Sequence, residues 1–399
     1  MKNIHGLIIS LLLLLPFEST LGATTNQFDR FGGFTDIQRE ASGFFRVEQV
    51  GGRWMFITPE GHGYMALGIN HIDIFLKDQA DAMLQRLGGD RKKVEESLIQ
   101  SVQDLGFNAG GAYGSGQQQF QMQMPWIASL QYPGGEKFKL DVFDPEWQAK
   151  LHETVVRQCR AFADDPFVLG VSFIDLPHYG NFRIHYFRTL PESAPGRKRY
   201  EEAKKAGLSD DEFMGIVADT LYAQLKAAVR EGAPHHLFFG EKFQLRNAPD
   251  PVLKAVGKYV DVFCTQALVR SEHRPPEWQI FQKDGYDHEF QLIGKPMVIV
   301  DWSSFFSLSE TFDTPAGTVK PEAAAAEDRA RWLADACTQP HIIGVFRCFL
   351  IGLHPNDKML EGRGSRSCLR DDGTPFPVMT ESVGKANRAA LQQVYKKMK

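Results

Sequence analysis

The sequence predicts a (β/α)8 barrel, in which eight parallel strands alternate with helices. Eight apolar, strand-like runs follow one another from residue 64 onward, and amphipathic segments of helical periodicity separate most of them. The ~360 residues after the N-terminal segment suit one such barrel with extended loops. An open doubly wound sheet is the alternative, but the glycine-dense stretch NAGGAYGSG lacks the GxGxxG pattern of a phosphate-binding turn.

Composition and charge narrow the class of protein. The chain has 399 residues, of which 43% are hydrophobic, 12% aromatic and 24% charged, which is typical of a globular protein and excludes a disordered one. The formal net charge is -4 and the pI is about 6.3. A chain without a basic surface is not expected to bind nucleic acid.

The N-terminus is typical of a secretory signal peptide. Lys2 precedes an apolar run over residues 7–17, and the small residues Gly22 and Ala23 end the segment. Residues 1–23 are therefore expected to be cleaved, which predicts a secreted or periplasmic protein with no stable membrane insertion. An N-terminal membrane anchor is the alternative. A polar lead, 24–42, is expected to precede a single barrel domain over 43–399.

A β-hairpin is predicted where the barrel domain begins. FFRVEQV and RWMFITP alternate between apolar and polar residues, and Gly51-Gly52 joins them. The strand candidates that follow are YMALGIN, FNAGGAY, PWIASL, PFVLGVSFI, HLFFGEKF, VDVFCTQAL, PMVIVDW and IIGVFRCFL. The helix candidates are RKKVEESLIQSVQDLG, DPEWQAKLHETVVRQCRAFADD, SDDEFMGIVADTLYAQLKAAVREG and EAAAAEDRARWLADACTQ.

The cysteines give no indication of a metal centre. There are five, an odd number, without a CxxC pair or a Cys/His zinc spacing. Cys264 and Cys348 lie inside apolar runs and are interpreted as small core residues. No metal and no cofactor is expected.

Polar and aromatic residues cluster at the predicted carboxyl ends of the strands, where barrel enzymes carry their chemistry. They are His71, Asp73, Asn108, Tyr113, Asp175, His178, Tyr179, Glu241, Lys242, Gln266, Asp301, Trp302, Arg347 and His354. Aromatic faces can stack on a sugar ring, and amide, imidazole and carboxylate groups can bind its hydroxyls. The pattern therefore predicts a polysaccharide or oligosaccharide as the ligand.

Several of these segments resemble one known family. They resemble segments of the agarase-like glycoside hydrolases and occur in the same order along the chain. These segments are SGFFRVEQVGGRWMFITPEGHGYMALGINHI, LGFNAGGAYG, FDPEWQAKLHETVVRQCRAFADDPFVLGVSF, GKPMVIVDWSSF and HIIGVFRCFLIGLHPND. The resemblance covers the chain from about residue 43 onward. It implies a (β/α)8 barrel of the large retaining clan, in which an acid/base Glu follows Asn at the end of strand four and a nucleophilic Glu ends strand seven.

The chain departs from that pattern at both catalytic positions. Asp301 stands at the nucleophile position, Asp175 at the Asn position and Leu176 at the acid/base position. Leucine cannot protonate a leaving group. Two shortened acids could suit the ~6.5–9.5 Å carboxyl separation of inverting enzymes better than the ~5 Å of retaining ones. Asp301, Asp175 and Glu241 are accordingly the predicted catalytic residues.

The predicted sugar-binding residues are His71, Asn108, His178, Tyr179, Lys242, Gln266, Trp302, Arg347 and His354. A hydrolase acting on a galactan, an agar-like or another marine-type glycan is the favoured function. One alternative is a sugar-binding barrel that has lost hydrolysis, as Leu176 suggests. Another is a polysaccharide lyase, in which Tyr179 or a histidine abstracts a proton while Lys242 or Arg347 neutralises a uronate carboxylate.

Overall fold

The computed structural model describes residues 27–72, 77–111, 124–135, 137–267, 280–302, 306–307, 320–352, 364–365 and 367–398. The predicted signal peptide and three of the predicted site residues, Asp73, Tyr113 and His354, lie outside these ranges. Among the described helices, none is long and apolar enough to cross a membrane.

Eight parallel strands form a closed barrel, which confirms the predicted fold. Around the wall they follow chain order, and the last strand pairs with the first. The strands are β5 (Ala66–Ile69), β6 (Ala109–Gly110), β7 (Trp126–Ser129), β8 (Val168–Asp175), β9 (Phe238–Gln244), β10 (Phe263–Gln266), β11 (Met297–Trp302) and β14 (Ile342–Arg347). Each coincides with one of the eight apolar runs, although β8 and β9 extend one residue beyond theirs, so the position of every barrel strand was predictable.

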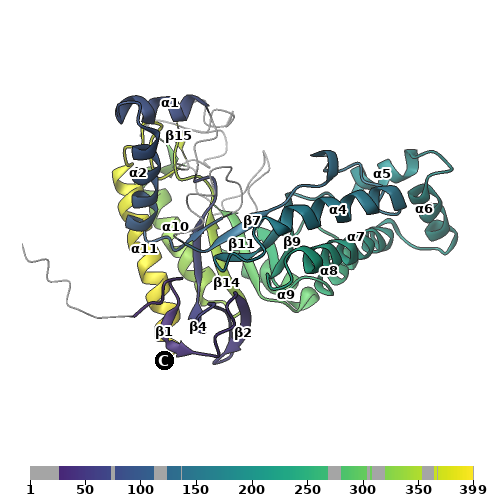
Figure 1. Ribbon diagram of the computed structural model, residues 1–399, viewed down its shortest axis with the longest axis horizontal. Helices are drawn as coiled ribbons and strands as arrows, with labels where there is room; N and C mark the ends of the chain where they lie inside the picture. The colour runs from purple at the N-terminus through teal and green to yellow at the C-terminus, as the bar shows by residue number, and fades with distance from the viewer. Residues whose placement is uncertain are drawn as a thin grey trace, which may run out of the picture.

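Helices surround the barrel (Figure 1). The four predicted helices are present as α2 (Arg91–Asp104), α4 (Pro145–Arg160), α7 (Asp210–Gly232) and α10 (Glu322–Thr338). Helix α7 begins with a reciprocal capping box between Ser209 and Glu212, which satisfies backbone donors that the first turn leaves unpaired. Helices not predicted are α1 (Lys77–Arg86), α5 (Asn181–Thr189), α6 (Pro195–Lys205), α8 (Asp250–Gly257), α9 (Lys283–Ile293) and α11 (Pro377–Lys396).

An antiparallel sheet covers the amino-terminal end of the barrel. Its order is β1 (Phe34–Gln38), β4 (His62–Tyr64), β3 (Arg53–Ile57) and β2 (Arg46–Val50). The predicted hairpin is β2–β3, and Gly51 and Gly52 both have positive φ, as its tight turn requires. Strand β1 lies within the segment 24–42, which was expected to be a polar lead.

The barrel interior is filled with side chains. Phe31, Phe45 and Phe56 from the N-terminal part pack against inward-facing barrel residues such as Phe239 and Phe346. A Cβ on Gly68 would lie 2.1 Å from the Phe346 ring, so that glycine is required for the ring to fit. Because this end is closed and packed, chemistry is confined to the carboxyl-terminal mouth.

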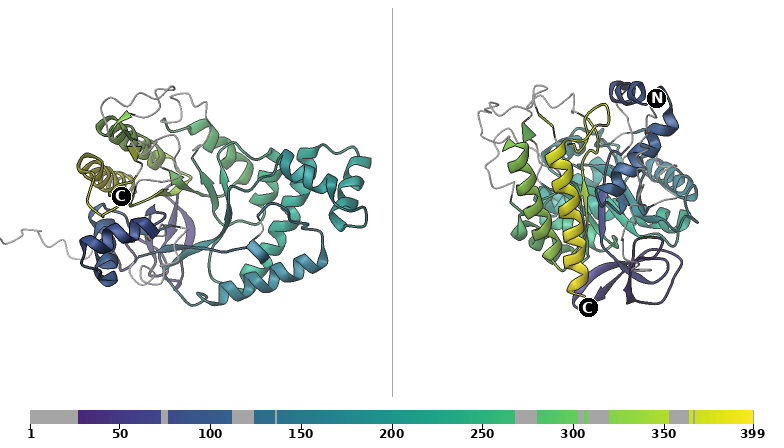
Figure 2. Two further views of the ribbon diagram at one scale, coloured as in Figure 1. Left: turned by 90° about the horizontal axis from the view of Figure 1, so that it is seen from above. Right: turned by 90° about the vertical axis from the view of Figure 1, so that its left-hand side faces the viewer.

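Additional elements follow the strands at the mouth. A small sheet combines β12 (Phe306–Ser307), β13 (Lys320–Pro321) and β15 (Gly364–Ser365), and β15 lies near α1 at the end opposite β2 and β4 (Figure 1). Helices α5 and α6 project sideways from the barrel, whereas α10 and α11 lie side by side on the opposite flank (Figure 2).

Candidate active site

Among the residues that the structure describes, five strand ends at the mouth hold a non-glycine residue in the left-handed region of backbone conformation. These are His71, Leu176, Arg246, Asp301 and Phe349, with φ between 52° and 60°. Such conformations cost of order 1 kcal/mol or more each and persist where the surrounding structure enforces them. The mouth therefore has the strained, fixed backbone that is common at functional sites.

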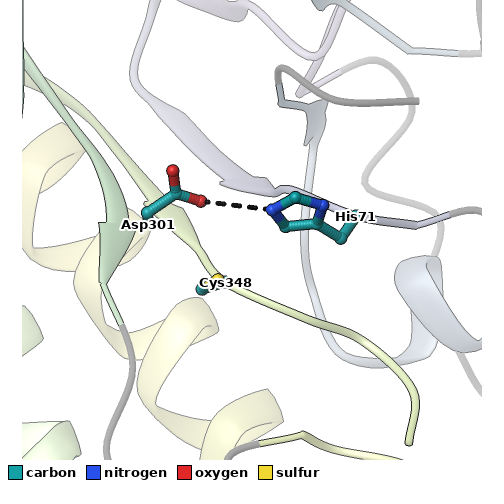
Figure 3. A group of neighbouring side chains, drawn as sticks. All are labelled: His71, Asp301 and Cys348. Carbon is teal, nitrogen blue, oxygen red and sulfur yellow. Dashed lines mark ion pairs between the residues drawn. The ribbon is translucent and has the colours of Figure 1, made fainter. Parts of the chain in front are cut away.

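Asp301 points into the mouth at the end of β11, the seventh barrel strand. Asn70 donates from Nδ2 to Oδ1 of Asp301 at 2.5 Å, and Nε2 of His71 lies 3.8 Å from the same oxygen (Figure 3). Asn70 follows β5, which is separated from β11 by β14. Side chains two strands apart converge only on the inner side of a barrel, so this contact fixes the orientation of Asp301.

Asp175 points into the mouth at the end of β8, the fourth strand. Gln266, at the end of β10, donates a hydrogen bond to Oδ1 of Asp175 across the intervening β9. By the same geometric argument, this contact places both side chains inside the mouth. Asp175 and Asp301 are three strands apart around the wall, and so they face each other across the mouth.

Lys242, on β9, is the register partner of Asp175 on the neighbouring strand β8. Its Nζ donates to the carbonyl oxygen of Phe173 and, at 3.3 Å, to Oγ of Ser129. Burial lowers the pKa of Lys242, and the charges of Asp175 and Asp301 act in the opposite direction. The ammonium reaches Ser129 on β7 from β9, two strands away, so it lies on the inner side of the barrel with the Asp175 carboxylate.

Glu241, the third predicted catalytic acid, lies outside the mouth. Tyr132 and Tyr179 donate hydrogen bonds to its two carboxylate oxygens at 2.9 and 2.6 Å, and its backbone N–H donates to Tyr222 Oη on α7. Burial raises the pKa of Glu241, opposed by the Arg183 charge. The carboxylate therefore faces the helices, and this placement does not support a role as proton donor.

Three predicted sugar contacts are also elsewhere. Asn108 bonds the backbone of Leu67 and Met65 at the amino-terminal end of β6. Trp302 is 5% exposed and stacks on Trp332 of α10, with ring centroids 4.2 Å apart. Arg347 is 1% exposed and lies on the outer side of the wall, near Arg329 on α10, whose pKa is lowered by burial and, in addition, by the Arg347 charge.

The loop after β8 contributes one buried and one exposed side chain. Tyr179 is 1% exposed and is directed at Glu241, so it anchors the loop. His178 is exposed and packs edge-on against Phe138, which also contacts Phe182. Phe182 is 52% exposed. These three rings form an aromatic rim that could stack on a sugar.

Sequence reasoning missed four residues of this region. Asn70 could have been found from its place beside His71 at the end of the first strand. Phe138 and Phe182 gave no signal, because a single aromatic residue, in an irregular segment like Phe138 or in a helix like Phe182 of α5, is usually a packing residue. Cys348 was interpreted as core, and it is 4% exposed, but its Sγ lies within 4.8 Å of ligand atoms of His71 and Asp301 (Figure 3).

The solved structures that this chain resembles include agarases. The agarase AgWH50C matches with a TM-score of 0.75 over 93% of this chain and 67% of its own, at 16% sequence identity. An exo-β-agarase matches at 0.75 over 92% and 68%, with 17% identity. BpGH50 matches at 0.70 over 93% and 87%, with 18% identity. The predicted resemblance in fold is thereby confirmed.

No protein-family model matches the sequence, and no curated protein sequence does. At 16–18% identity, the structural matches establish the barrel and not the reaction. The activity of this chain therefore has to be inferred from the side chains in the mouth.

Proposed function

We propose that this protein is an exported glycoside hydrolase that acts on a polysaccharide or oligosaccharide, of the galactan, agar-like or another marine type. The observation that carries the proposal is the pair of carboxylates, Asp175 on strand four and Asp301 on strand seven, facing each other across the mouth. The agarase folds support the choice of substrate class. The signal-like N-terminus supports export.

In this mechanism Asp301 acts on the anomeric carbon, directly or through a water molecule. Asn70 occupies one of its oxygens and holds the carboxylate in a single orientation. Asp175 lies on the opposite side of the mouth, where a proton donor to the leaving oxygen is needed, and exposed His178 follows it by three residues. If the two carboxyl groups are far enough apart to admit a water molecule, the reaction proceeds with inversion of configuration.

A sugar-binding protein without turnover is the second candidate. Leu176 occupies the predicted acid/base position, and its backbone is held at φ 53°. Its N–H donates to the carbonyl oxygen of Lys242, so the chain cannot easily turn another side chain into this place. Asp175 must then supply the proton, or no group does.

The lyase alternative receives less support from the geometry. Tyr179, the proposed base of that reaction, is buried and donates a hydrogen bond to Glu241. Arg347, proposed to neutralise the uronate, lies on the outer side of the barrel wall. Of the groups proposed for that reaction, only Lys242 and the histidines His71 and His178 lie at the mouth among the described residues.

The test is turnover by the mature protein on a panel of polysaccharides, with both new reducing ends and absorbance of unsaturated products measured. Asp301→Asn keeps the shape of the side chain and removes its charge, so hydrolysis should fall by ~10²-fold or more while glycan binding persists. Unsaturated products would instead indicate a lyase. Equal turnover by wild type and Asp301→Asn would contradict the proposed site.

A second variant separates the hydrolase from the binding protein. The double change Leu176→Glu with Asp301→Glu rebuilds the usual pair of the resembled family on the same scaffold. If wild type binds a glycan without cleaving it and the double variant cleaves it, the natural protein is a binding protein. If wild type already cleaves it, the hydrolase proposal stands.

A further inference from the structure

Three different metal-ligand side chains converge at neighbouring strand ends. Asp301 lies in β11, Cys348 directly follows β14, and His71 lies two residues after β5. These strands are adjacent in the barrel wall. One ligand atom from each residue lies within 4.8 Å of the other two, and the imidazole and carboxylate point toward each other with the sulfur beside them (Figure 3).

The neighbours of these side chains restrict their movement. The His71 ring stacks on Phe349, with centroids 4.4 Å apart and an interplanar angle of 11°. Asn70 fixes one oxygen of Asp301, and the backbone N–H of Cys348 donates to the carbonyl oxygen of Trp302 at 2.9 Å. His71, Asp301 and Phe349 are all left-handed, so the strain of the mouth is concentrated around this group.

The donor set suits a borderline-soft divalent ion. Imidazole nitrogen, thiolate sulfur and carboxylate oxygen are the ligands of Zn²⁺, at bond lengths of ~2.0–2.3 Å. Tetrahedral bonds of that length separate ligand atoms by ~3.3–3.7 Å. The 3.8 Å between His71 Nε2 and Asp301 Oδ1 nearly meets this value. Since all three ligand atoms lie within 4.8 Å of one another, no pair has to approach by more than about 1.5 Å to bind one ion.

A second group of possible ligands shows what a purely structural cluster looks like. Asp29, Glu60 and His62 also approach within 4.8 Å of one another. Here Oδ1 of Asp29 accepts from the backbone of Phe31 and Gly33, while Oδ2 accepts from Thr58 Oγ1 and lies 2.8 Å from His62 Nδ1. Hydrogen bonds account for the approach of Asp29 and His62, Glu60 pairs with Arg30, and His62 serves below as the control.

We propose that His71, Asp301 and Cys348 bind one divalent transition-metal ion of the Zn²⁺ class. Three protein ligands leave a fourth coordination position, and the partial exposure of the His71 side chain, 26%, directs it toward the mouth. Sequence spacing could not predict this site, because its ligands are 230 and 47 residues apart. The proposal goes beyond hydrolysis, since an ion can bind whether or not the protein cleaves a glycan.

The test is metal binding by the resting, chelator-treated protein without any glycan. Isothermal titration with Zn²⁺ should give one site per chain. Titration with Co²⁺ should give a tetrahedral visible spectrum with a sulfur-to-cobalt charge-transfer band, which reports the cysteine directly. Cys348→Ser should remove that band, and His71→Gln and Asp301→Asn should each weaken Zn²⁺ binding by ~10-fold or more.

Two control variants carry the same chemical changes elsewhere. Cys159→Ser alters a buried cysteine on α4, and His62→Gln alters the hydrogen-bonded cluster. Both should bind Zn²⁺ and Co²⁺ as wild type does, and circular dichroism identifies any variant that has failed to fold. Cys348→Ala is a second test of whether the Cys348 thiolate binds the metal, and it should also remove the charge-transfer band.

No stoichiometric Zn²⁺ binding by wild type would overturn the proposal. So would a charge-transfer band that survives in both Cys348→Ser and Cys348→Ala. Each result is independent of the polysaccharide panel, so loss of the metal site and loss of the hydrolase proposal are distinguishable.

Discussion

Glu241 and Lys242 are neighbours on β9, both fully buried, yet they serve opposite sides of the barrel wall. Glu241 faces the helices and is held by tyrosines, whereas Lys242 faces the mouth beside Asp175. Successive side chains of a strand point to opposite faces. Glu241 therefore has a structural role on the outer face of the wall, while the next residue, Lys242, lies in the candidate active site. Buried charge alone therefore does not identify chemistry.

The largest expected effect is a loss of stability when Glu241, on the outer side of the barrel wall, is changed. Glu241→Ala leaves two buried tyrosine hydroxyls without their acceptor and removes the negative charge near Arg183, whose guanidinium lies 4.6 Å above the Tyr179 ring. Breaking a buried, charged network should lower the free energy of unfolding by roughly 3–5 kcal/mol. Urea denaturation followed by circular dichroism measures this.

The surface pair of Glu60 with Arg30 supplies the control, because its side chains are 41% and 62% exposed. Glu60→Ala should change stability by less than ~1 kcal/mol. If Glu241→Ala unfolds like wild type and instead abolishes turnover, Glu241 belongs to the reaction and the distinction between the two faces fails.

Glu289, a second buried acid outside the barrel mouth, should make the free energy of unfolding depend on pH. Burial raises the pKa of Glu289 on α9 to about 8, although the backbone N–H of Arg246 and the Thr265 side chain act in the opposite direction. A raised folded-state pKa means that its contribution is complete below the unfolded value near 4.5 and is lost as pH rises to about 8.

Glu289→Gln cannot ionise, so it isolates this contribution. The difference in unfolding free energy between the variant and wild type should shift in favour of the variant by ~2 kcal/mol or more from pH 4.5 to pH 8. Parallel urea titrations at both pH values give the difference. A difference that stays constant with pH would show that Glu289 is not held protonated.

In the barrel mouth, Asp175→Asn should lower turnover and leave the free energy of unfolding unchanged. The amide restores the residue type of the resembled family but cannot donate an acidic proton, so kcat should fall by ~10- to 100-fold with unchanged glycan binding. Steady-state kinetics on the substrate found in the panel measures this. Unchanged kcat would assign proton transfer to another group, with exposed His178 the next to be tested.

The smallest effect is expected at the aromatic rim. Phe182→Ala removes an exposed ring from the group formed with Phe138 and His178, and it should raise KM by a few-fold, since stacking contributes ~0.5–1.5 kcal/mol. Val378→Ala, an exposed apolar change on α11, is the control and should leave KM unchanged. If both changes raise KM equally, the aromatic rim is not part of the sugar-binding site.

The barrel, the hairpin and the order of the strands follow from the pattern of apolar and polar residues along the chain. Apolar runs of strand length, separated by amphipathic helical segments, allow few other arrangements. The mouth positions of His71, Asp175, Lys242, Gln266 and Asp301 could be predicted because each lies at the carboxyl end of such a run. Strand ends meet at one edge whatever the helices between them do.

The tertiary structure alone decided which face of the wall each polar side chain occupies. Barrel strands are apolar on both faces, so periodicity does not say that Glu241, Trp302 and Arg347 point outward. Alternation also fails at the strand ends, where Leu176 and Asp301 are left-handed and the β8–β9 and β11–β14 registers shift. The meeting of His71, Asp301 and Cys348 depends on closure of the barrel, because only the pairing of β14 with β5 brings the first and last strand ends together.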